Sequence, residues 1–83
     1  MSTIDVKFVA SELAPGLENG QYEIEDGASV LDLLKKCEVA CGVKIPEKNL
    51  QYLYTMFNGR PVRLEDELSG EGTLQFCRIV FGG

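Results

Sequence analysis

The chain has 83 residues, of which 45% are hydrophobic and 25% are charged, and this ordinary balance indicates one small globular domain without extensive disorder. Its formal net charge of −5 argues against nucleic-acid binding, for which a basic patch is expected, and suits either solubility alone or a basic partner surface. No apolar run approaches the ~20 residues of a membrane span, and the first ten residues lack the basic and long apolar regions of a secretory signal, so we expect a cytoplasmic protein without membrane contact.

The first quarter of the chain predicts two strands. Residues 4–9 alternate between apolar and polar side chains, which is typical of a strand with one buried face. Residues 11–20 contain proline, glycine and an Asn-Gly pair, and they predict a loop with one helical turn at most. Alternation returns in residues 21–26, so we expect a second strand that pairs with the first.

A helix is the clearest element of the sequence. Ser29 is a favourable N-cap residue, and Asp32 lies where a capping box places its acidic partner. Gly42 is a favourable residue to end the helix. The apolar side chains between them fall on one stripe at helical spacing: Val30, Leu33, Leu34, Cys37 and Cys41.

The second half of the chain predicts a hairpin and a final strand. Residues 50–57 carry apolar side chains on both faces, so one face should cover the helix and the other should leave apolar surface near solvent. Asn58-Gly59 directly after this strand indicates a tight hairpin turn. Residues 60–72 predict a short strand with turns, and residues 73–81 predict the last strand.

This order of elements predicts an α+β protein in which one main helix packs on one face of a mixed four- to five-stranded sheet. Its length and order suit a β-grasp. We expect a single domain over residues 1–79, followed by a flexible Gly-Gly tail at residues 80–83.

Side chains able to perform catalysis are scarce. The chain has no histidine, which removes the most common general base and excludes Ser-His and Cys-His pairs. The glycine patterns of phosphate-binding loops are also absent. We therefore expect neither an enzyme nor a bound cofactor. Two acidic runs predict solvated surface, with a partner contact as the alternative: Glu23, Glu25 and Asp26, and Glu65, Asp66 and Glu67.

The three cysteines are Cys37, Cys41 and Cys77. Cys37 and Cys41 lie one helical turn apart and could share a metal ion, but they also fall on the apolar stripe, where free cysteine packs as a small hydrophobic residue. An iron–sulfur cluster of the β-grasp type needs a different spacing and a fourth cysteine. Core packing is the preferred interpretation, and no metal is expected.

The last two residues are glycines, and they are the most informative feature of the chain. A terminal carboxyl group has a pKa of about 3.3–3.7, so it is ionised and unreactive until it is joined to AMP as a mixed anhydride. Gly82 carries no side chain that would block a narrow channel, and residues 80–83 could extend about 13–14 Å at about 3.3–3.6 Å per residue. The sequence thus predicts that another enzyme reaches the carboxyl group of Gly83. A frayed end is the alternative.

Four segments resemble the ubiquitin-like sulfur-carrier family, which includes the small subunit of molybdopterin synthase and its relative in thiamine synthesis. They are IDVKFVASELA, IEDGASVLDLL, FNGRPV and GEGTLQFCRIVFGG, and together the resemblance covers nearly the whole chain. The chain departs from the family pattern at the extra Gly72, at Arg78 and Ile79 where prolines are frequent, and at Phe81 where a small residue is common.

The resemblance implies a carrier that is a cosubstrate and contributes no catalytic side chain. An E1-like adenylating enzyme would activate Gly83, and a sulfur donor of the cysteine desulfurase or rhodanese type would convert the acyl-adenylate to a thiocarboxylate. The sulfur would then pass to an acceptor bound by the large subunit of a synthase. Gly82 would give clearance, and the apolar outer sheet face, for which we name Leu53 and Phe57, would dock partners together with Phe81.

The pathway stays open at this point. Synthesis of the molybdenum or tungsten cofactor is favoured, because SELA after the first strand looks more like that branch. The alternatives are a carrier for thiamine synthesis, a protein modifier joined to lysine side chains, and a β-grasp interaction subunit whose tail is inert.

Overall fold

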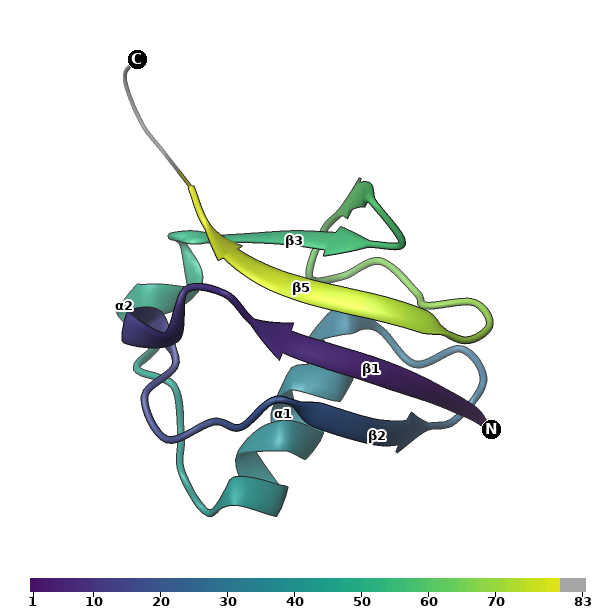
Figure 1. Ribbon diagram of the computed structural model, residues 1–83, viewed down its shortest axis with the longest axis horizontal. Coiled ribbons are helices and arrows are strands. Elements are labelled where there is room, and N and C mark those ends of the chain that lie inside the picture. Colours follow the sequence, from purple (N-terminus) through teal and green to yellow (C-terminus); the bar gives the residue numbers. More distant parts are fainter. Residues whose placement is uncertain (80–83) are drawn as a thin grey trace.

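The computed structural model describes residues 1–79, which form a five-stranded mixed sheet with one long helix on one face (Figure 1). The strand order is β2-β1-β5-β3-β4; β1 and β5 are parallel and the other neighbours are antiparallel. No helix in residues 1–79 has the length and apolar character needed to cross a membrane. Along the chain the elements are β1 (Ser2–Phe8), η1 (Ser11–Leu13), β2 (Gly20–Ile24), α1 (Val30–Cys41), α2 (Glu47–Leu50), β3 (Leu53–Phe57), β4 (Arg60–Val62) and β5 (Gly72–Arg78).

The core lies between the sheet and α1. Alternation in the two central strands, β1 and β5, directs every second side chain toward the helix. Phe8 and Phe76 are neighbours in this register, and their rings stack with centroids 5.1 Å apart. The fully buried side chains of the core are Ile4, Val6, Val30, Leu33, Leu34, Cys37, Leu74 and Phe76.

Both ends of α1 confirm the sequence prediction. The Ser29 hydroxyl accepts a hydrogen bond from the Asp32 amide at 3.1 Å, and the Asp32 carboxylate accepts one from the Ser29 amide at 3.0 Å. Hydrogen bonding of the Asp32 carboxylate to Ser29, chiefly to its amide, lowers the pKa of Asp32. Gly42 ends the helix with φ of 70°, a left-handed conformation that glycine adopts without strain.

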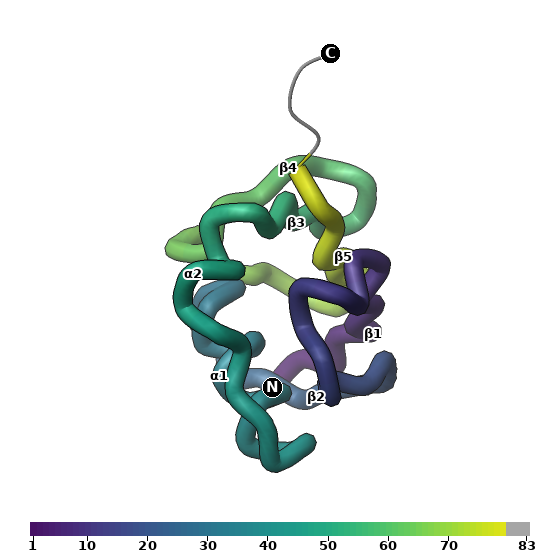
Figure 2. The backbone as a smooth tube through the Cα atoms, turned by 90° about the vertical axis from the view of Figure 1, so that its left-hand side faces the viewer, coloured from purple at the N-terminus to yellow at the C-terminus, as the bar shows by residue number. Residues whose placement is uncertain are grey.

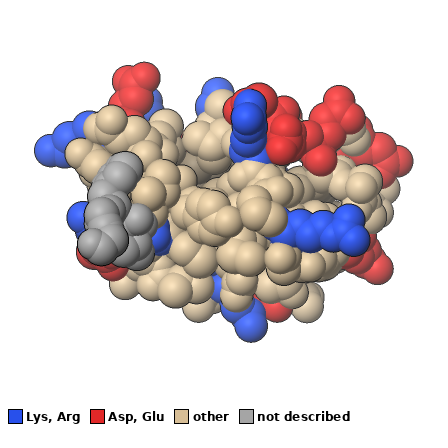
Figure 3. All heavy atoms as spheres, turned by 90° about the horizontal axis from the view of Figure 1, so that it is seen from above, with Lys and Arg blue, Asp and Glu red and all other residues tan. Residues whose placement is uncertain are grey.

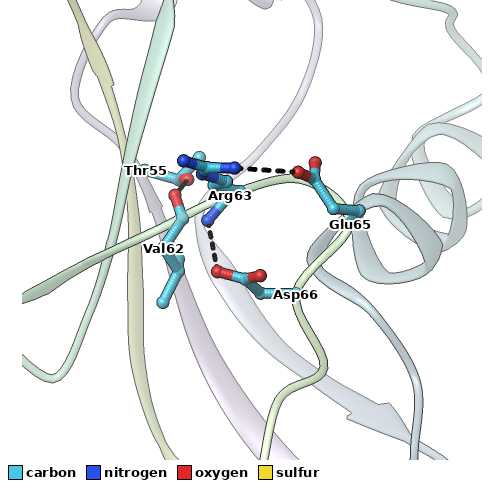
Figure 4. Close-up of polar contacts among 5 residues, drawn as sticks. All are labelled: Thr55, Val62, Arg63, Glu65 and Asp66. Carbon is cyan, nitrogen blue, oxygen red and sulfur yellow. Dashed lines mark hydrogen bonds and ion pairs between the residues drawn. The ribbon is translucent and has the colours of Figure 1, made fainter.

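The segment after β4 is fixed by short-range polar contacts (Figure 4). The Arg63 amide donates to the Asp66 carboxylate at 2.9 Å, and the Arg63 guanidinium lies 3.9 Å from Glu65. The buried hydroxyl of Thr55 donates to the Val62 carbonyl, which satisfies a polar group within the sheet.

The same segment completes the start of α1. The first amide groups of a helix have no partner within the helix. Here the Val30 amide donates to the Asp66 carbonyl at 2.9 Å, and the Leu31 amide donates to the Leu64 carbonyl at 2.8 Å. Residues far apart in the sequence therefore hold α1 on the sheet.

Several strand limits differ from the predictions. The strand predicted over residues 50–57 begins only at Leu53, because Glu47–Leu50 forms the short helix α2. The Asn49 side chain of α2 donates to the Leu13 carbonyl at 3.1 Å, so this turn depends on a contact with a distant segment. The last strand spans Gly72–Arg78, and the part of the predicted strand beyond residue 79 lies outside the described residues.

The hairpin between β3 and β4 is confirmed, and it explains Gly72. Asn58 and Gly59 both have positive φ, at 52° and 81°. The Asn58 side-chain oxygen accepts a hydrogen bond from the Thr73 amide at 2.9 Å. A Cβ atom on Gly72 would lie 2.2 Å from that same oxygen, so glycine leaves the space that the Asn58 side chain occupies.

Candidate functional site

The candidate site is the end of β5, where the described chain leaves the sheet. β5 lies at the centre of the sheet, between β1 and β3. Beyond its last residue, the Ile79 amide donates to the Tyr52 carbonyl at 2.8 Å, and the Arg78 guanidinium lies 3.5 Å from the Glu12 carboxylate. Three segments therefore meet around this point: the end of β5, the turn before β3, and η1. Figure 2 shows the end of β5 at the edge of the molecule.

The residues predicted to carry the chemistry come shortly after Ile79 in the sequence. Phe81, Gly82 and Gly83 lie outside the described residues, and their roles stay predictions. The same holds for the domain boundary between residues 79 and 80. The structure describes the point from which this segment starts.

An apolar surface lies beside the end of β5, on the sheet face opposite α1. Tyr54 and Cys77 are direct neighbours in the register of β3 and β5, and Met56 follows on the same face. Tyr54 is 41% exposed, and Val9, directly after β1, is 61% exposed. We call these four residues the outer patch. Figure 3 looks onto the molecule from above Figure 1, where residues other than Lys, Arg, Asp and Glu cover much of the surface, several acidic side chains gather along one side, and basic side chains project at separate places.

The residues named for docking in the sequence analysis occupy the other face. Leu53 and Phe57 are half-buried and pack against the core, with the buried Thr55 between them. The apolar surface predicted near solvent exists, but Tyr54 and Met56 form it in β3 in place of Leu53 and Phe57. A docking role for Leu53 and Phe57 themselves stays a prediction that their half-buried position does not favour.

The cysteines occupy three different environments. Cys37 is fully buried in the core, and burial raises its pKa to about 12, so its thiol stays protonated at neutral pH. The sulfur of Cys41 lies 3.7 Å from the Tyr22 hydroxyl, and burial together with this contact raises the pKa of Tyr22. Cys77 is half-buried in the outer patch. Within residues 1–79, no group of three His, Cys, Asp or Glu side chains could hold a metal ion.

The position of the outer patch suits recognition by another protein. The outer patch is apolar, and one of its residues, Cys77, lies on β5, the strand that leads to the C-terminal residues. The role of Tyr52, whose carbonyl accepts a hydrogen bond from the Ile79 amide, could not be predicted from the sequence, because a backbone contact leaves no signal in residue type.

Comparison with known proteins identifies the fold class. No protein-family description and no curated protein matches the sequence. Among solved structures, the chain is similar to SAMP1 from Haloferax volcanii, with 17% identity, a TM-score of 0.66, and coverage of 99% of this chain and 100% of that one. A second structure, of small archaeal modifier protein 1 from H. volcanii, gives 16% identity, a TM-score of 0.68, and coverage of 96% and 100%.

A third similar structure is a putative molybdopterin converting factor, subunit 1, from Pyrococcus furiosus. It shares 19% identity with a TM-score of 0.67, and the match covers 96% of this chain and 100% of that one. At these identities the likeness establishes the fold, and it confirms the predicted ubiquitin-like β-grasp with a mixed sheet and one main helix.

Proposed function

We propose that this protein is a ubiquitin-like sulfur carrier whose Gly83 carboxyl group is adenylated and then converted to a thiocarboxylate. The observation that carries the proposal is the path of β5. This central strand runs past the outer patch and leads into a segment that ends in two glycines. An activating enzyme that binds the outer patch would therefore have the carboxyl group of Gly83 within reach of its own active site.

The chemistry belongs to the partners. The Gly83 carboxylate attacks the α-phosphorus of ATP and displaces pyrophosphate, which leaves an acyl-adenylate. A persulfide on the donor then attacks the carbonyl carbon and displaces AMP, which gives an acyl disulfide. A thiol reductant cleaves the S–S bond of this acyl disulfide, leaves the thiocarboxylate on Gly83 and is itself oxidised to a disulfide. The carrier supplies a carboxyl group free of neighbouring side chains, because Gly82 precedes it, and it supplies the docking surface. It acts in this scheme as a cosubstrate in the cytoplasm, without a bound cofactor.

Synthesis of the molybdenum or tungsten cofactor is the pathway we favour. The similar fold of a putative molybdopterin converting factor subunit supports this choice, together with the SELA segment after β1. The acceptor would then be held by the large subunit of a synthase. A carrier for thiamine synthesis would use the same activation and differ only in the acceptor.

Protein modification is the second candidate function. The similar fold of small archaeal modifier protein 1 favours it, since a modifier is by its name joined to other proteins. Activation of the carboxyl group is common to both functions. They separate at the next step, where either a sulfur atom or a lysine amine displaces AMP.

The direct test is intact mass spectrometry after incubation with an E1-like adenylating enzyme, ATP, a cysteine desulfurase with cysteine, and a thiol reductant that releases the thiocarboxylate. The proposal predicts a mass gain equal to the exchange of one oxygen for one sulfur, which depends on ATP. Deletion of Gly83 should abolish this gain. An equal gain in the deletion variant would place the sulfur elsewhere in the chain and refute the proposal.

A cell blot against the protein separates the two candidates. A modifier predicts bands of higher mass that disappear when Gly83 is deleted. A carrier predicts the free protein alone, with the thiocarboxylate detectable by mass. Pathway function that survives deletion of both Gly82 and Gly83 would contradict both candidates and support an interaction subunit.

A further inference from the structure

The two edges of the sheet are protected to different extents. β4 forms one edge, and it is three residues long with Pro61 at its centre, two features that discourage pairing with another strand. β2 forms the other edge over the five residues Gly20–Ile24, which include no proline. In the described part of the chain no strand pairs with β2 on its outer side.

The backbone groups that β2 offers at this edge can be identified. In an antiparallel pair, alternate residues bond to the partner strand, and the residues between them point away. The Lys36 ammonium group donates to the backbone carbonyl of Glu23. This contact shows that the backbone amide and carbonyl groups of Glu23 point away from β1. Two residues earlier, Gln21 has the same orientation. Gln21 and Glu23 therefore present amide and carbonyl groups to the free edge, and Tyr22 and Ile24 bond to β1.

Lys36 is the single side chain seen to occupy this edge in residues 1–79. It extends from α1, and its contact with Glu23 is exposed to solvent. An exposed lysine contact contributes little to stability and can be displaced. A hollow of about 450 Å³ adjoins the end of β2, and its lining includes the acidic residues Glu25, Asp26 and Asp32 together with Lys36.

The acidic side chains along the β2 edge indicate the charge of a partner that would bind there. Glu18, Glu23, Glu25 and Asp26 are all exposed here. The nearby cations are Lys36, the Met1 amino group, 3.8 Å from Asp26, and the exposed Lys7, which follows Val6 in β1 beside the start of β2. A second copy of this chain would place the same acidic residues against one another, and like charges at paired positions oppose association. A basic strand would meet complementary charge.

The two faces of the sheet beside the β2 edge differ in polarity. Gln21 and Glu23 direct exposed polar side chains to the outer face of the sheet. On the helix side lie the half-buried Tyr22 ring and Cys41, which contact each other. A strand added here would therefore place every second side chain beside carboxylate groups and the others beside apolar atoms.

We propose that the free edge of β2 is a docking site for an extended protein segment in which basic residues alternate with apolar residues. Backbone hydrogen bonds to Gln21 and Glu23 would extend the sheet by one strand, as in other cases of β-strand addition. The incoming strand would displace Lys36 from the Glu23 carbonyl. β1 separates this edge from β5, so a partner could hold the protein here while the end of β5 remains accessible.

A labelled octapeptide of alternating lysine and valine tests the site, with an octapeptide of alternating glutamate and valine as its matched control. NMR titration of the full chain should shift the amide signals of Gln21 and Glu23 first, and raised salt should weaken binding. Shifts that centre on the outer patch, equal binding of the acidic peptide, or no shift at millimolar peptide would each overturn the proposal.

Three substitutions refine the test. Gln21→Pro removes an amide that faces the free edge but no bond to β1, and it should weaken binding about tenfold or more. Lys36→Met should strengthen binding, because it removes the side chain that occupies the edge. Glu71→Gln changes an exposed carboxylate away from β2 and should leave binding unchanged. If Gln21→Pro lowers the melting temperature, Glu23→Gln replaces it, and unchanged affinity in Glu23→Gln contradicts the proposed charge recognition.

Discussion

Gly72→Ala should stabilise the protein only when the Asn58 side chain is removed. In the parent protein a Cβ atom at residue 72 would lie 2.2 Å from the Asn58 side-chain oxygen, so that side chain must move. Its 2.9 Å hydrogen bond from the Thr73 amide is then lost, at a cost of about 0.5–1.5 kcal/mol. Alanine reduces the conformational freedom of the unfolded chain, which offsets about 0.4–1 kcal/mol of this cost.

A double-mutant cycle separates the two effects. Asn58→Gly loses the hydrogen bond but keeps the turn, because glycine adopts the φ of 52° without strain. In that background Gly72→Ala should stabilise the protein by about 0.4–1 kcal/mol, while in the parent it should be neutral or destabilising. The coupling between the sites should therefore equal the hydrogen bond, about 0.5–1.5 kcal/mol.

Urea denaturation followed by circular dichroism measures each free energy of unfolding, and unchanged m-values would show that the unfolded state is the same in all four proteins. Additive effects at the two sites would refute the reasoning. So would a Gly72→Ala variant that stabilises the parent protein as much as it stabilises Asn58→Gly.

Three other predictions follow from the structure. Ser29→Ala removes the hydroxyl that accepts from the Asp32 amide but keeps the Ser29 amide that donates to the Asp32 carboxylate, and it should lower the free energy of unfolding by about 1 kcal/mol in the same urea assay; no loss would contradict a stabilising cap. Because burial raises the pKa of Cys37 to about 12, the folded state keeps a proton that the unfolded state releases from about pH 8.5, so stability should fall as pH rises from about 8.5 toward 12. Between about pH 8.5 and 10, Cys37→Ala should flatten this slope, and an unchanged slope would assign it to other groups. Tyr54→Glu in the outer patch should weaken binding to the activating enzyme about tenfold by calorimetry, whereas Val39→Glu, at a position 83% exposed on α1, should not; equal effects would exclude the outer patch as the docking surface.

Local signals in the sequence were sufficient for the turns and the helix ends. Ser29, Asp32 and Gly42 have side-chain or backbone preferences that act within one helical turn, so the limits of α1 could be predicted closely. The hairpin turn at Asn58-Gly59 could be predicted because both residues tolerate positive φ. Each of these features depends on residues adjacent in the chain.

The orientation of β3 could not be predicted, because both of its faces carry apolar side chains. The buried position between Leu53 and Phe57 is Thr55, a polar residue whose hydroxyl is satisfied by the Val62 carbonyl. A polar residue in a core position hides the usual alternation. The face of β3 is set by its register with β5, in which Thr55 lies beside Phe76, and that contact is not local.

Helix α2 could not be predicted for a related reason. Its four residues are too few for a hydrophobic period to appear. Its position depends on the hydrogen bond from Asn49 to Leu13, which connects residues 36 positions apart. The consequence for the candidate site is direct, since α2 precedes Tyr52, and Tyr52 holds Ile79 at the end of β5.

Tandem mass spectrometry of the C-terminal tryptic peptide tests the central claim most directly. Trypsin cleaves after Arg78 and releases the peptide IVFGG, which contains Gly83 and no cysteine. In protein purified from cells, the account predicts a fraction of this peptide with one oxygen replaced by sulfur, and fragment ions that place the sulfur on Gly83. An unmodified peptide in cells with an active pathway, or sulfur found only on peptides that contain cysteine, would contradict it.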